Sequence, residues 1–461
     1  MTDLLRAIHD IVGKGGVLTG TDVSSRASGI WRPQGIEAQA IVRPRSTEEV
    51  SGILAMCNAA GQSVVAHGGL TGLVEGAVTE SGDLALSLER MNAIEEVNAV
   101  ERTMTVQSGV VLEAVQNAAE DVGLMYPLDI GGRGSCTVGG NIATNAGGNR
   151  VIRYGMTRDM VLGVEAVLAD GTVVSSMNRM IKNNAGYDVK QLFIGSEGCL
   201  GVVTRAVLRL REKPRSQETM LVACRSFDEI VELLKLMDAK LGGTLSAFEV
   251  LWNNFYRLVT TPPATQKPPL SQDYPYYALI EAMGGDPEGD HDRIEQAASE
   301  GYDAGLIADA VIASSEAQRL ELWAMRDDVE QVHQYSPMFI FDVSLRISKM
   351  ESYVAEVNRR LEETFGDYVN FTFGHIGDGN IHFGTSAGEG PEAQDGVKRA
   401  VYEPLESIGG SVSAEHGVGL DKKKYLKLSR NDAEIALMRT LKKALDPNGI
   451  LNPGKVFDLA A

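Results

Sequence analysis

The alternation of apolar and polar residues in the first half of the chain predicts short strands interspersed with helices. One predicted helix covers residues 46–58, because Ser46 and Glu49 form a capping box at its start. The other elements predicted in this half are strands at 40–44, 62–66, 84–88, 103–108, 161–168, 172–175 and 201–210, and a helix at 112–122. The pattern indicates an α+β domain that ends near Arg211, before a polar linker at 212–216.

The second half of the chain has longer helical stretches between its apolar strands. The predicted elements are helices at 227–241, 293–305, 316–333 and 433–445, and strands at 278–282, 339–344 and 371–374. Repeated β-α-β units with antiparallel pairing predict a ferredoxin-like α+β domain. Because 461 residues exceed one ordinary core, we expect two domains, 1–212 and 213–461, with the C-terminal end of the chain packing back on the first.

Composition narrows the classes of function. Apolar residues make up 44% of the chain and charged residues 23%, as in a globular protein, and the formal net charge of −19 argues against nucleic acid and anionic membranes as partners. No apolar run approaches the ~20 residues of a transmembrane helix, and the N-terminal residues do not resemble a secretory signal. The four cysteines form no Cys-x-x-Cys pair, so we expect buried thiols and a cytoplasmic enzyme.

Two segments near the C-terminus, 374–382 and 413–417, contain three of the seven histidines. Asp378-Gly379 is a strong signal for a two-residue hairpin turn, because both central positions of a type I′ turn need positive φ. In that hairpin His375 lies directly opposite His382, with the two Cβ atoms about 5 Å apart.

Two imidazoles at this spacing can share a divalent metal, and Glu415 or His416 could complete the site. The alternative is a pair of half-buried histidines beside a turn. The separate Glu-His pair favours the metal.

Glycine is frequent, at 50 residues, and it is clustered; two of the glycine-rich segments, Ala66–Leu73 and Ser135–Gly148, are candidate binding loops. A diphosphate needs several backbone N–H groups at close range, which small residues allow. Neither loop is a Gly-x-Gly-x-x-Gly after a strand, and no Gly-Lys-Ser/Thr occurs, so a Rossmann NAD site and an NTP site are not indicated. Two such loops in one domain, rich in Ser, Thr and Asn, favour a nucleotide cofactor.

These loops resemble the FAD-binding fold shared by vanillyl-alcohol oxidase-like enzymes. The motifs that carry the resemblance are Ile41-Val42-Arg43-Pro44, Ala66-His67-Gly68-Gly69-Leu70-Thr71-Gly72, Gly139–Gly148, Tyr154-Gly155, Gly195–Gly201, Gly374–His382, Ser413–Gly417 and Asn452-Pro453-Gly454-Lys455. Within that family the chain is most similar to the FAD-dependent D-2-hydroxyacid dehydrogenases, the D-2-hydroxyglutarate and D-lactate branch. Segments 127–131 and 184–188 resemble the D-2-hydroxyglutarate enzymes in particular.

The resemblance implies a two-part FAD-binding domain over 1–212, and a ferredoxin-like substrate-binding cap with the C-terminal FAD-linked oxidase domain over 213–461. The Gly-Gly-x-Thr-Gly context after His67 is that of relatives that bind FAD without a covalent bond. The residues implied as FAD contacts are His67, Gly68, Gly69, Leu70, Thr71, Gly72, Pro127, Asp129, Gly139, Gly140, Asn145, Gly148, Tyr154, Glu197, Gly198, Gly201, Val202 and Asn452.

The same resemblance implies the oxidation of a D-2-hydroxy acid to its 2-oxo acid. It assigns His375, His382 and Glu415 as ligands of a divalent metal, for which Zn²⁺ fits the donor set and Mn²⁺ or Fe²⁺ are alternatives. It assigns His416 as the base for the hydroxyl proton and Arg326 as the group that binds the substrate carboxylate.

Three departures from the D-2-hydroxyglutarate enzymes bear on the substrate side chain. Where the D-2-hydroxyglutarate enzymes have a threonine, a lysine and an asparagine, this chain has Glu330, Ile340 and Gly384. We therefore predict a small or apolar side chain, as in D-lactate or D-2-hydroxybutyrate. Arg346 and Lys349 could replace the missing cation, which leaves D-malate and D-2-hydroxyglutarate as alternatives.

Two other classes of function remain open at this point. One is a flavin oxidase of the same fold that uses O2 and needs no metal. The other is a metal-binding or hydrolytic protein whose glycine loops are only turns. For a dehydrogenase, the resemblance implies an electron-transfer flavoprotein or a quinone as acceptor, and a homodimer is expected.

Overall fold

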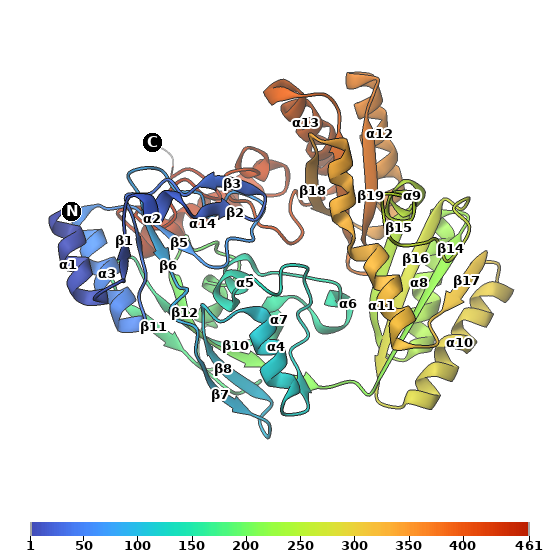
Figure 1. Cartoon of the computed structure of the whole chain (residues 1–461), viewed down its shortest axis with the longest axis horizontal. Coiled ribbons are helices and arrows are strands. Elements are labelled where there is room, and N and C mark those ends of the chain that lie inside the picture. The colour runs from blue at the N-terminus through green and yellow to red at the C-terminus, as the bar shows by residue number, and fades with distance from the viewer. Residues whose placement is uncertain (1, 460–461) are drawn as a thin grey trace. The chain divides into compact units, whose positions relative to one another are not determined.

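A computed structural model of the chain describes residues 2–459. The chain divides into two compact units. Unit 1 contains residues 1–148, 155–213 and 415–461, and unit 2 contains residues 149–154 and 214–414. Figure 1 gives the helices and strands of both.

Unit 1 is built on a four-stranded and a five-stranded sheet. The strands of the first, in spatial order, are β1 (Val17–Leu18), β4 (Ala40–Val42), β6 (Leu84–Ser87) and β5 (Val64–His67), and those of the second are β11 (Val173–Ser176), β10 (Val161–Val167), β12 (Val202–Arg209), β8 (Thr103–Gln107) and β7 (Ile94–Asn98). Two small ribbons pair β13 (Arg211–Glu212) with β9 (Leu124–Met125) and β2 (Ala27–Gly29) with β3 (Arg32–Gly35). The strands predicted from Ala40 to Leu210 are confirmed within a few residues.

The helices of unit 1 follow local sequence signals. The capped helix predicted at 46–58 is α3 (Thr47–Ala60), in which the Ser46 hydroxyl accepts a hydrogen bond from the Glu49 N–H. The closing helix α14 (Asp432–Leu445) begins with a capping box formed by Asn431 and Glu434. The remaining helices of unit 1 are α1 (Asp3–Val12), α2 (Thr21–Ser24), α4 (Leu112–Glu120), α5 (Val138–Thr144) and α7 (Thr157–Met160).

All four cysteines are buried and unpaired. Burial raises the pKa of the thiols of Cys57, Cys199 and Cys224 to about 12. These side chains therefore act as small apolar core residues, as the sequence predicted.

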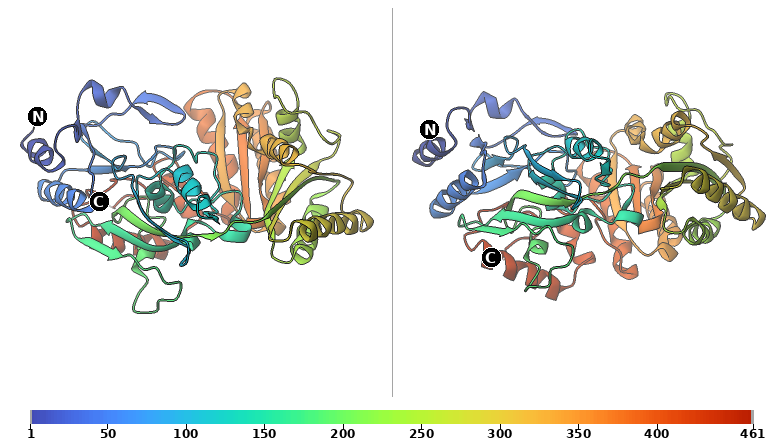
Figure 2. Two further views of the ribbon diagram at one scale, coloured as in Figure 1. Left: turned by 60° about the horizontal axis from the view of Figure 1, so that its bottom comes forward. Right: turned by 90° about the horizontal axis from the view of Figure 1, so that it is seen from below.

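Unit 2 is organised around one seven-stranded antiparallel sheet, whose strands lie side by side in Figure 2. Their spatial order is β17 (Asp309–Ile312), β14 (Ser216–Cys224), β16 (Tyr276–Gly284), β15 (Leu245–Trp252), β19 (Val369–His375), β20 (Asn380–Ser386) and β18 (Phe339–Ser344). The helices are α6 (Val151–Tyr154), α8 (Phe227–Leu241), α9 (Asn253–Thr260), α10 (Pro287–Asp303), α11 (Glu316–Asp327), α12 (Met350–Phe365) and α13 (Gly390–Ile408). This architecture confirms the α+β class expected from the sequence.

The two faces of this sheet carry different residues, because successive side chains of a strand point to opposite faces. One face packs against α9 and α11, whose Phe255, Tyr256 and Trp323 share a core cluster with Leu251 and Leu279 of the sheet. We call this the α9/α11 face. On the other face, Phe227 of α8 packs on Trp252 and Tyr276, and Tyr402 of α13 packs on Phe341.

Two predicted helices have different bounds in the structure. The helix expected at 293–305 begins earlier, at Pro287, because a proline is well accommodated in the first turn. The helix expected at 316–333 ends at Asp327, and Val329–Tyr335 forms a 3₁₀-helix instead. Across residues 2–459, no helix combines the length and the apolar character that a membrane span requires.

A buried ion pair joins α14 to the segment that follows it. The Lys442 ammonium donates to Asp446 and to the carbonyl oxygens of Cys199 and Leu451, and the Asp446 carboxylate also accepts from the Ile450 and Leu451 N–H groups.

Replacing Lys442 with Met should lower the free energy of unfolding by about 3–5 kcal/mol, because it leaves Asp446 buried without its cation. Urea denaturation measures the change. Lys443→Met, one residue along on the exposed side of the helix, is the control and should change stability by less than about 0.5 kcal/mol. Equal stability of the two variants would contradict the prediction.

Candidate functional site

The histidine hairpin forms, but in a different register from the predicted one. β19 ends at His375, Ile376–Asp378 form a 3₁₀-helix, and β20 begins at Asn380. His382 lies opposite Phe373, so the predicted direct pairing of His375 with His382 is wrong. Because the shift is two residues, both histidines still point to the same sheet face.

Tertiary hydrogen bonds explain the longer turn. The Asn380 amide donates to the Val343 carbonyl oxygen at 2.9 Å, and the Leu345 N–H donates to the Gly379 carbonyl oxygen at 3.0 Å, so β18 holds the start of β20. Gly379 has the expected positive φ of 91°, whereas Asp378 belongs to the 3₁₀-helix.

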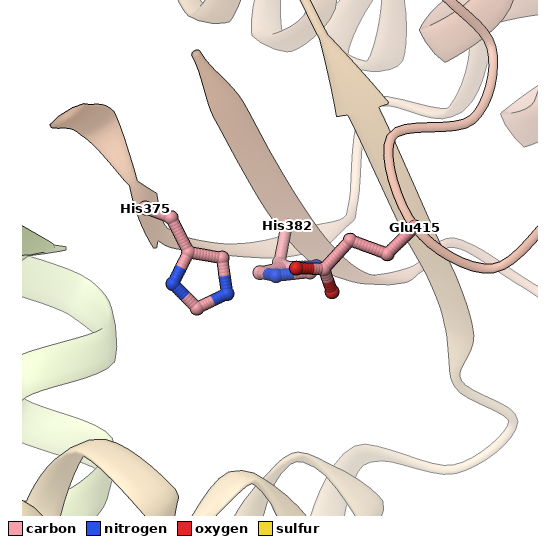
Figure 3. Close-up of side chains that lie close together, drawn as sticks. All are labelled: His375, His382 and Glu415. Carbon is pink, nitrogen blue, oxygen red and sulfur yellow. The ribbon is translucent and has the colours of Figure 1, made fainter. Parts of the chain in front are cut away.

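The two histidines and Glu415 form a cluster with the donor types of a metal site. The ring centroids of His375 and His382 are 5.2 Å apart. One ligand atom from each of His375, His382 and Glu415 lies within 4.8 Å of the others, and Figure 3 shows the three side chains pointing toward one another. Two imidazoles and a carboxylate are a donor set that fits Zn²⁺.

Glu415 directly follows the last residue of unit 2, and that segment is tethered to β18. Asp342, which is fully buried opposite His382 in the sheet, accepts hydrogen bonds from the Ala414 N–H and the Ser413 hydroxyl, both at 3.2 Å. Asp342, Glu415 and His416 also bring ligand atoms within 4.8 Å of one another. The predicted base therefore lies beside the predicted metal ligand, and a buried carboxylate fixes the chain just before both.

The buried carboxylate of Glu249, on β15, contacts both His375 and Arg326. Glu249 is the direct cross-strand partner of His375 and only 1% exposed. One of its oxygens lies 2.6 Å from His375 Nδ1, and the other accepts from Arg326 Nε at 2.7 Å. Burial opposes the charge of this carboxylate, but His375 and Arg326 outweigh it and lower the pKa of Glu249 to about 2.

Arg326, at the C-terminal end of α11, is 6% exposed and lies on the same sheet face. Its guanidinium carbon is 5.1 Å from the centre of the Phe373 ring, and its Nη2 is 3.2 Å from His375 Nε2. The structure thus brings the predicted carboxylate-binding arginine next to His375, one of the predicted metal ligands.

Glu249 and Asp342 were not among the residues predicted for the site. A signal was present, since each is a single acid inside an apolar strand, Phe248-Glu249-Val250 and Phe341-Asp342-Val343. A buried acid of this kind requires a partner. The partner itself is decided by strand order, which the local pattern does not encode.

In unit 1 the two glycine loops lie against each other. A Cβ on Gly68 would be 2.7 Å from Thr137 Oγ1, and a Cβ on Gly69 would overlap the Ser135 carbonyl oxygen. A Cβ on Gly139 would be 2.6 Å from the Ser108 Cβ, whereas Gly72 faces open space. This close backbone approach fits a loop pair that wraps a diphosphate.

The segment after Gly195 joins the same region. The N–H groups of Gly195 and Glu197 donate to the carbonyl oxygens of Ile142 and Ala143 at the end of α5. Asn452 then connects this segment to β5, because its side chain accepts from the Ala66 N–H at 2.9 Å and donates to the Glu197 carbonyl oxygen at 2.6 Å.

Glu197 also anchors the loop that follows His416. Its carboxylate accepts from the Val418 and Gly419 N–H groups at 2.7 and 2.8 Å. Burial raises the pKa of Glu197 in spite of these bonds. Glu197, a predicted FAD contact, therefore joins the end of α5 through its backbone and the loop after the predicted base through its carboxylate.

The other predicted FAD contacts are distributed as follows. His67 is buried, and its Nε2 lies 2.9 Å from the Ala77 carbonyl oxygen. Burial lowers the pKa of the His67 imidazole to about 4, so the ring is neutral. Tyr154 belongs to unit 2, where its hydroxyl contacts the Met283 sulfur. The remaining residues lie in or beside the glycine loops and β12 of unit 1: Leu70, Thr71, Pro127, Asp129, Gly140, Asn145, Gly148, Gly198, Gly201 and Val202.

Two protein families match the chain. The family described as "FAD binding domain" matches residues 38–176, and the family described as "FAD linked oxidases, C-terminal domain" matches residues 213–456. The chain belongs to the FAD-linked oxidases. FAD is therefore its cofactor, as the family resemblance implied.

Its relatives carry related names. The chain is 43% identical to "D-2-hydroxyglutarate dehydrogenase" of Xanthomonas citri, over 93% of this chain and 90% of the relative. It is 38% identical to the mitochondrial enzyme of that name from Bos taurus, over 91% of this chain and 77% of the relative. It is also 36% identical to a putative mitochondrial D-lactate dehydrogenase of Schizosaccharomyces pombe, over 91% of this chain and 82% of the relative.

Solved structures share the fold. p-Cresol methylhydroxylase matches with a TM-score of 0.78 at 17% identity, over 99% of this chain and 96% of that one. Alkyldihydroxyacetonephosphate synthase matches with a TM-score of 0.75 at 17% identity, over 98% of this chain and 86% of the synthase chain. The expected vanillyl-alcohol oxidase-type fold is confirmed.

Replacing Gly69 with Ala should weaken FAD binding at least tenfold, about 1.4 kcal/mol, because the added methyl group forces the two loops apart. FAD affinity is measured by titration of the apoprotein. Gly82→Ala is the matched control, since a Cβ there meets nothing within 4 Å. An unchanged FAD affinity in Gly69→Ala would show that the loop contact does not shape the site.

Proposed function

We propose that this protein is an FAD-dependent dehydrogenase that oxidises a D-2-hydroxy acid to the 2-oxo acid with the help of a divalent metal. One observation carries the proposal: a buried arginine contacts His375, a member of the His375-His382-Glu415 cluster, in a chain with an FAD-binding domain. A carboxylate-binding cation next to a metal-type donor set fits a substrate with a hydroxyl group adjacent to its carboxylate.

Each residue has a distinct task in this reaction. Arg326 binds and orients the substrate carboxylate through its guanidinium. His375, His382 and Glu415 would hold the metal, and His416 takes the proton of the substrate hydroxyl on an imidazole nitrogen. When bound, the metal supplies polarisation of the hydroxyl oxygen, and FAD supplies the two-electron acceptor.

We further propose that FAD is bound without a covalent link to His67. This is supported by the burial of His67, which is 3% exposed, and by its Nε2, which is 2.9 Å from the Ala77 carbonyl oxygen.

The substrate side chain that we propose is small or apolar. Gly384 lies opposite Ile340, two residues along the strand from His382, and a Cβ on Gly384 would be 3.2 Å from Val332 Cγ1 and 3.4 Å from the Met338 sulfur. Arg346, the candidate replacement cation, is exposed and donates to the Ile408 carbonyl oxygen. This end of the sheet face is therefore apolar.

D-2-hydroxyglutarate is the second candidate substrate, because it is named in the relatives at 38–43% identity. For the electrons we propose an electron-transfer flavoprotein or a quinone as acceptor. A cytoplasmic homodimer completes the proposal.

Anaerobic addition of substrate should bleach the flavin with D-2-hydroxy acids and leave it oxidised with the L-enantiomers. Absorbance of the purified yellow protein measures this. We expect kcat/KM for D-lactate to exceed that for D-2-hydroxyglutarate. If kcat/KM for D-2-hydroxyglutarate exceeds that for D-lactate by tenfold or more, about 1.4 kcal/mol of transition-state preference, a substrate with a small apolar side chain is excluded. If no 2-hydroxy acid bleaches the flavin, the proposed function fails.

Replacing His382 with Ala should reduce zinc affinity by more than about 100-fold, since the loss of a ligand exceeds the 10–100-fold effect of an outer partner. Chelator competition measures the affinity. His291→Ala is the control, because this half-exposed histidine pairs with Glu218 outside the cluster. Chelation should also abolish activity and Zn²⁺ or Mn²⁺ should restore it. Full activity of a metal-stripped sample would instead favour the O2-using oxidase.

A further inference from the structure

The carboxylate of Glu249 contacts two residues with different proposed tasks. His375 is a proposed metal ligand and Arg326 a proposed substrate-binding residue, and each takes one oxygen of Glu249, at 2.6 and 2.7 Å. At 1% exposure, this carboxylate has no competing bulk water. Within unit 2 it is held between them by strand pairing, because Glu249 and His375 are direct partners in the register of β15 and β19.

The contacts around His375 also define its proton. Arg326 can only donate, so its Nη2 group, 3.2 Å from His375 Nε2, requires a lone pair on that nitrogen. The proton of the neutral ring is then on Nδ1, where it is donated to Glu249. A metal-binding imidazole needs this arrangement, with Nε2 unprotonated and Nδ1–H bonded to a carboxylate.

The lone pair of Nε2 can serve only one partner at a time. A cation bound at Nε2 would take the place of the Arg326 contact, and the guanidinium would keep its bond to Glu249 through Nε. Glu249 thereby orients the arginine for a substrate carboxylate while it orients the histidine for the metal.

We propose that Glu249 is a positioning residue shared by the metal site and the substrate-carboxylate site. The inference rests on the proposed function and deepens it: metal affinity and carboxylate affinity depend on the same buried side chain. Glu281, on the same face of the adjacent strand, offers a comparison. It is fully buried and pairs with Arg150 at 3.0 Å and with Trp323 at 3.1 Å.

The test compares Glu249→Gln with the wild-type, FAD-loaded protein. Glutamine keeps the size of the side chain but can accept at only one of its two terminal atoms, so it cannot serve both donors. Zinc affinity, measured by competition with a chromophoric chelator, should fall 10–100-fold. Affinity for pyruvate, measured by calorimetry at a zinc concentration that saturates each variant, should fall at least tenfold.

Three controls separate this role from a structural one. Glu281→Gln should leave both affinities within about twofold of wild type although it also removes a buried charge. Glu249→Asp keeps the charge and should recover part of both affinities. FAD content and melting temperature establish whether each variant is folded. If Glu249→Gln does not fold, Glu249→Asp decides the test, and it should show losses of both affinities that are smaller than those expected for Glu249→Gln.

The outcomes are distinct. Unchanged zinc and pyruvate affinities in the Glu249 variants overturn the inference, and a loss of only one of them overturns the shared role. Neither affinity measurement requires turnover. If the wild-type protein oxidises no hydroxy acid, the proposed function is wrong, and the two titrations still decide the role of Glu249.

Discussion

Charge buried on the α9/α11 face of the seven-stranded sheet has to be paired within the protein, and this constraint organises unit 2. Glu249, His375 and Arg326 are all nearly inaccessible, and each satisfies another. Asp342 accepts hydrogen bonds from the Ala414 N–H and the Ser413 hydroxyl, in the segment that leads to Glu415. An unpaired charge at any of these positions would cost several kcal/mol, so the chemistry of the site and the stability of the sheet depend on the same contacts.

Strand geometry makes this arrangement available. Residues two apart share a face, and direct cross-strand neighbours lie within contact distance. Glu249, His375, His382 and Asp342 come from four adjacent strands and all reach one face. The opposite face is filled by apolar packing against α8 and α13, as Phe227 and Tyr402 illustrate. One face of the sheet thus carries the polar cluster next to an apolar core, and the other face is apolar throughout this packing.

Local signals in the sequence predicted much of the fold. The Ser46 cap, the strand runs of unit 1 and the glycine loops depend on near neighbours or on steric demands that a few residues express. The hairpin register was predicted incorrectly because Asn380 and Gly379 bond to β18, a strand more than thirty residues earlier in the chain. The end of α11 at Asp327 was missed because the helical periodicity of the sequence continues past the residue where the helix stops.

The sequence by itself determined the family, the cofactor and the residue types of the candidate site, because glycine loops and histidine motifs are contiguous in the chain. Only the tertiary structure decided which groups meet. Glu249 lies 126 residues before His375, and Arg326 reaches both from a helix. Contacts of this kind depend on strand order and on the pairing of buried charge, which emerge when the sheet assembles and leave no local pattern.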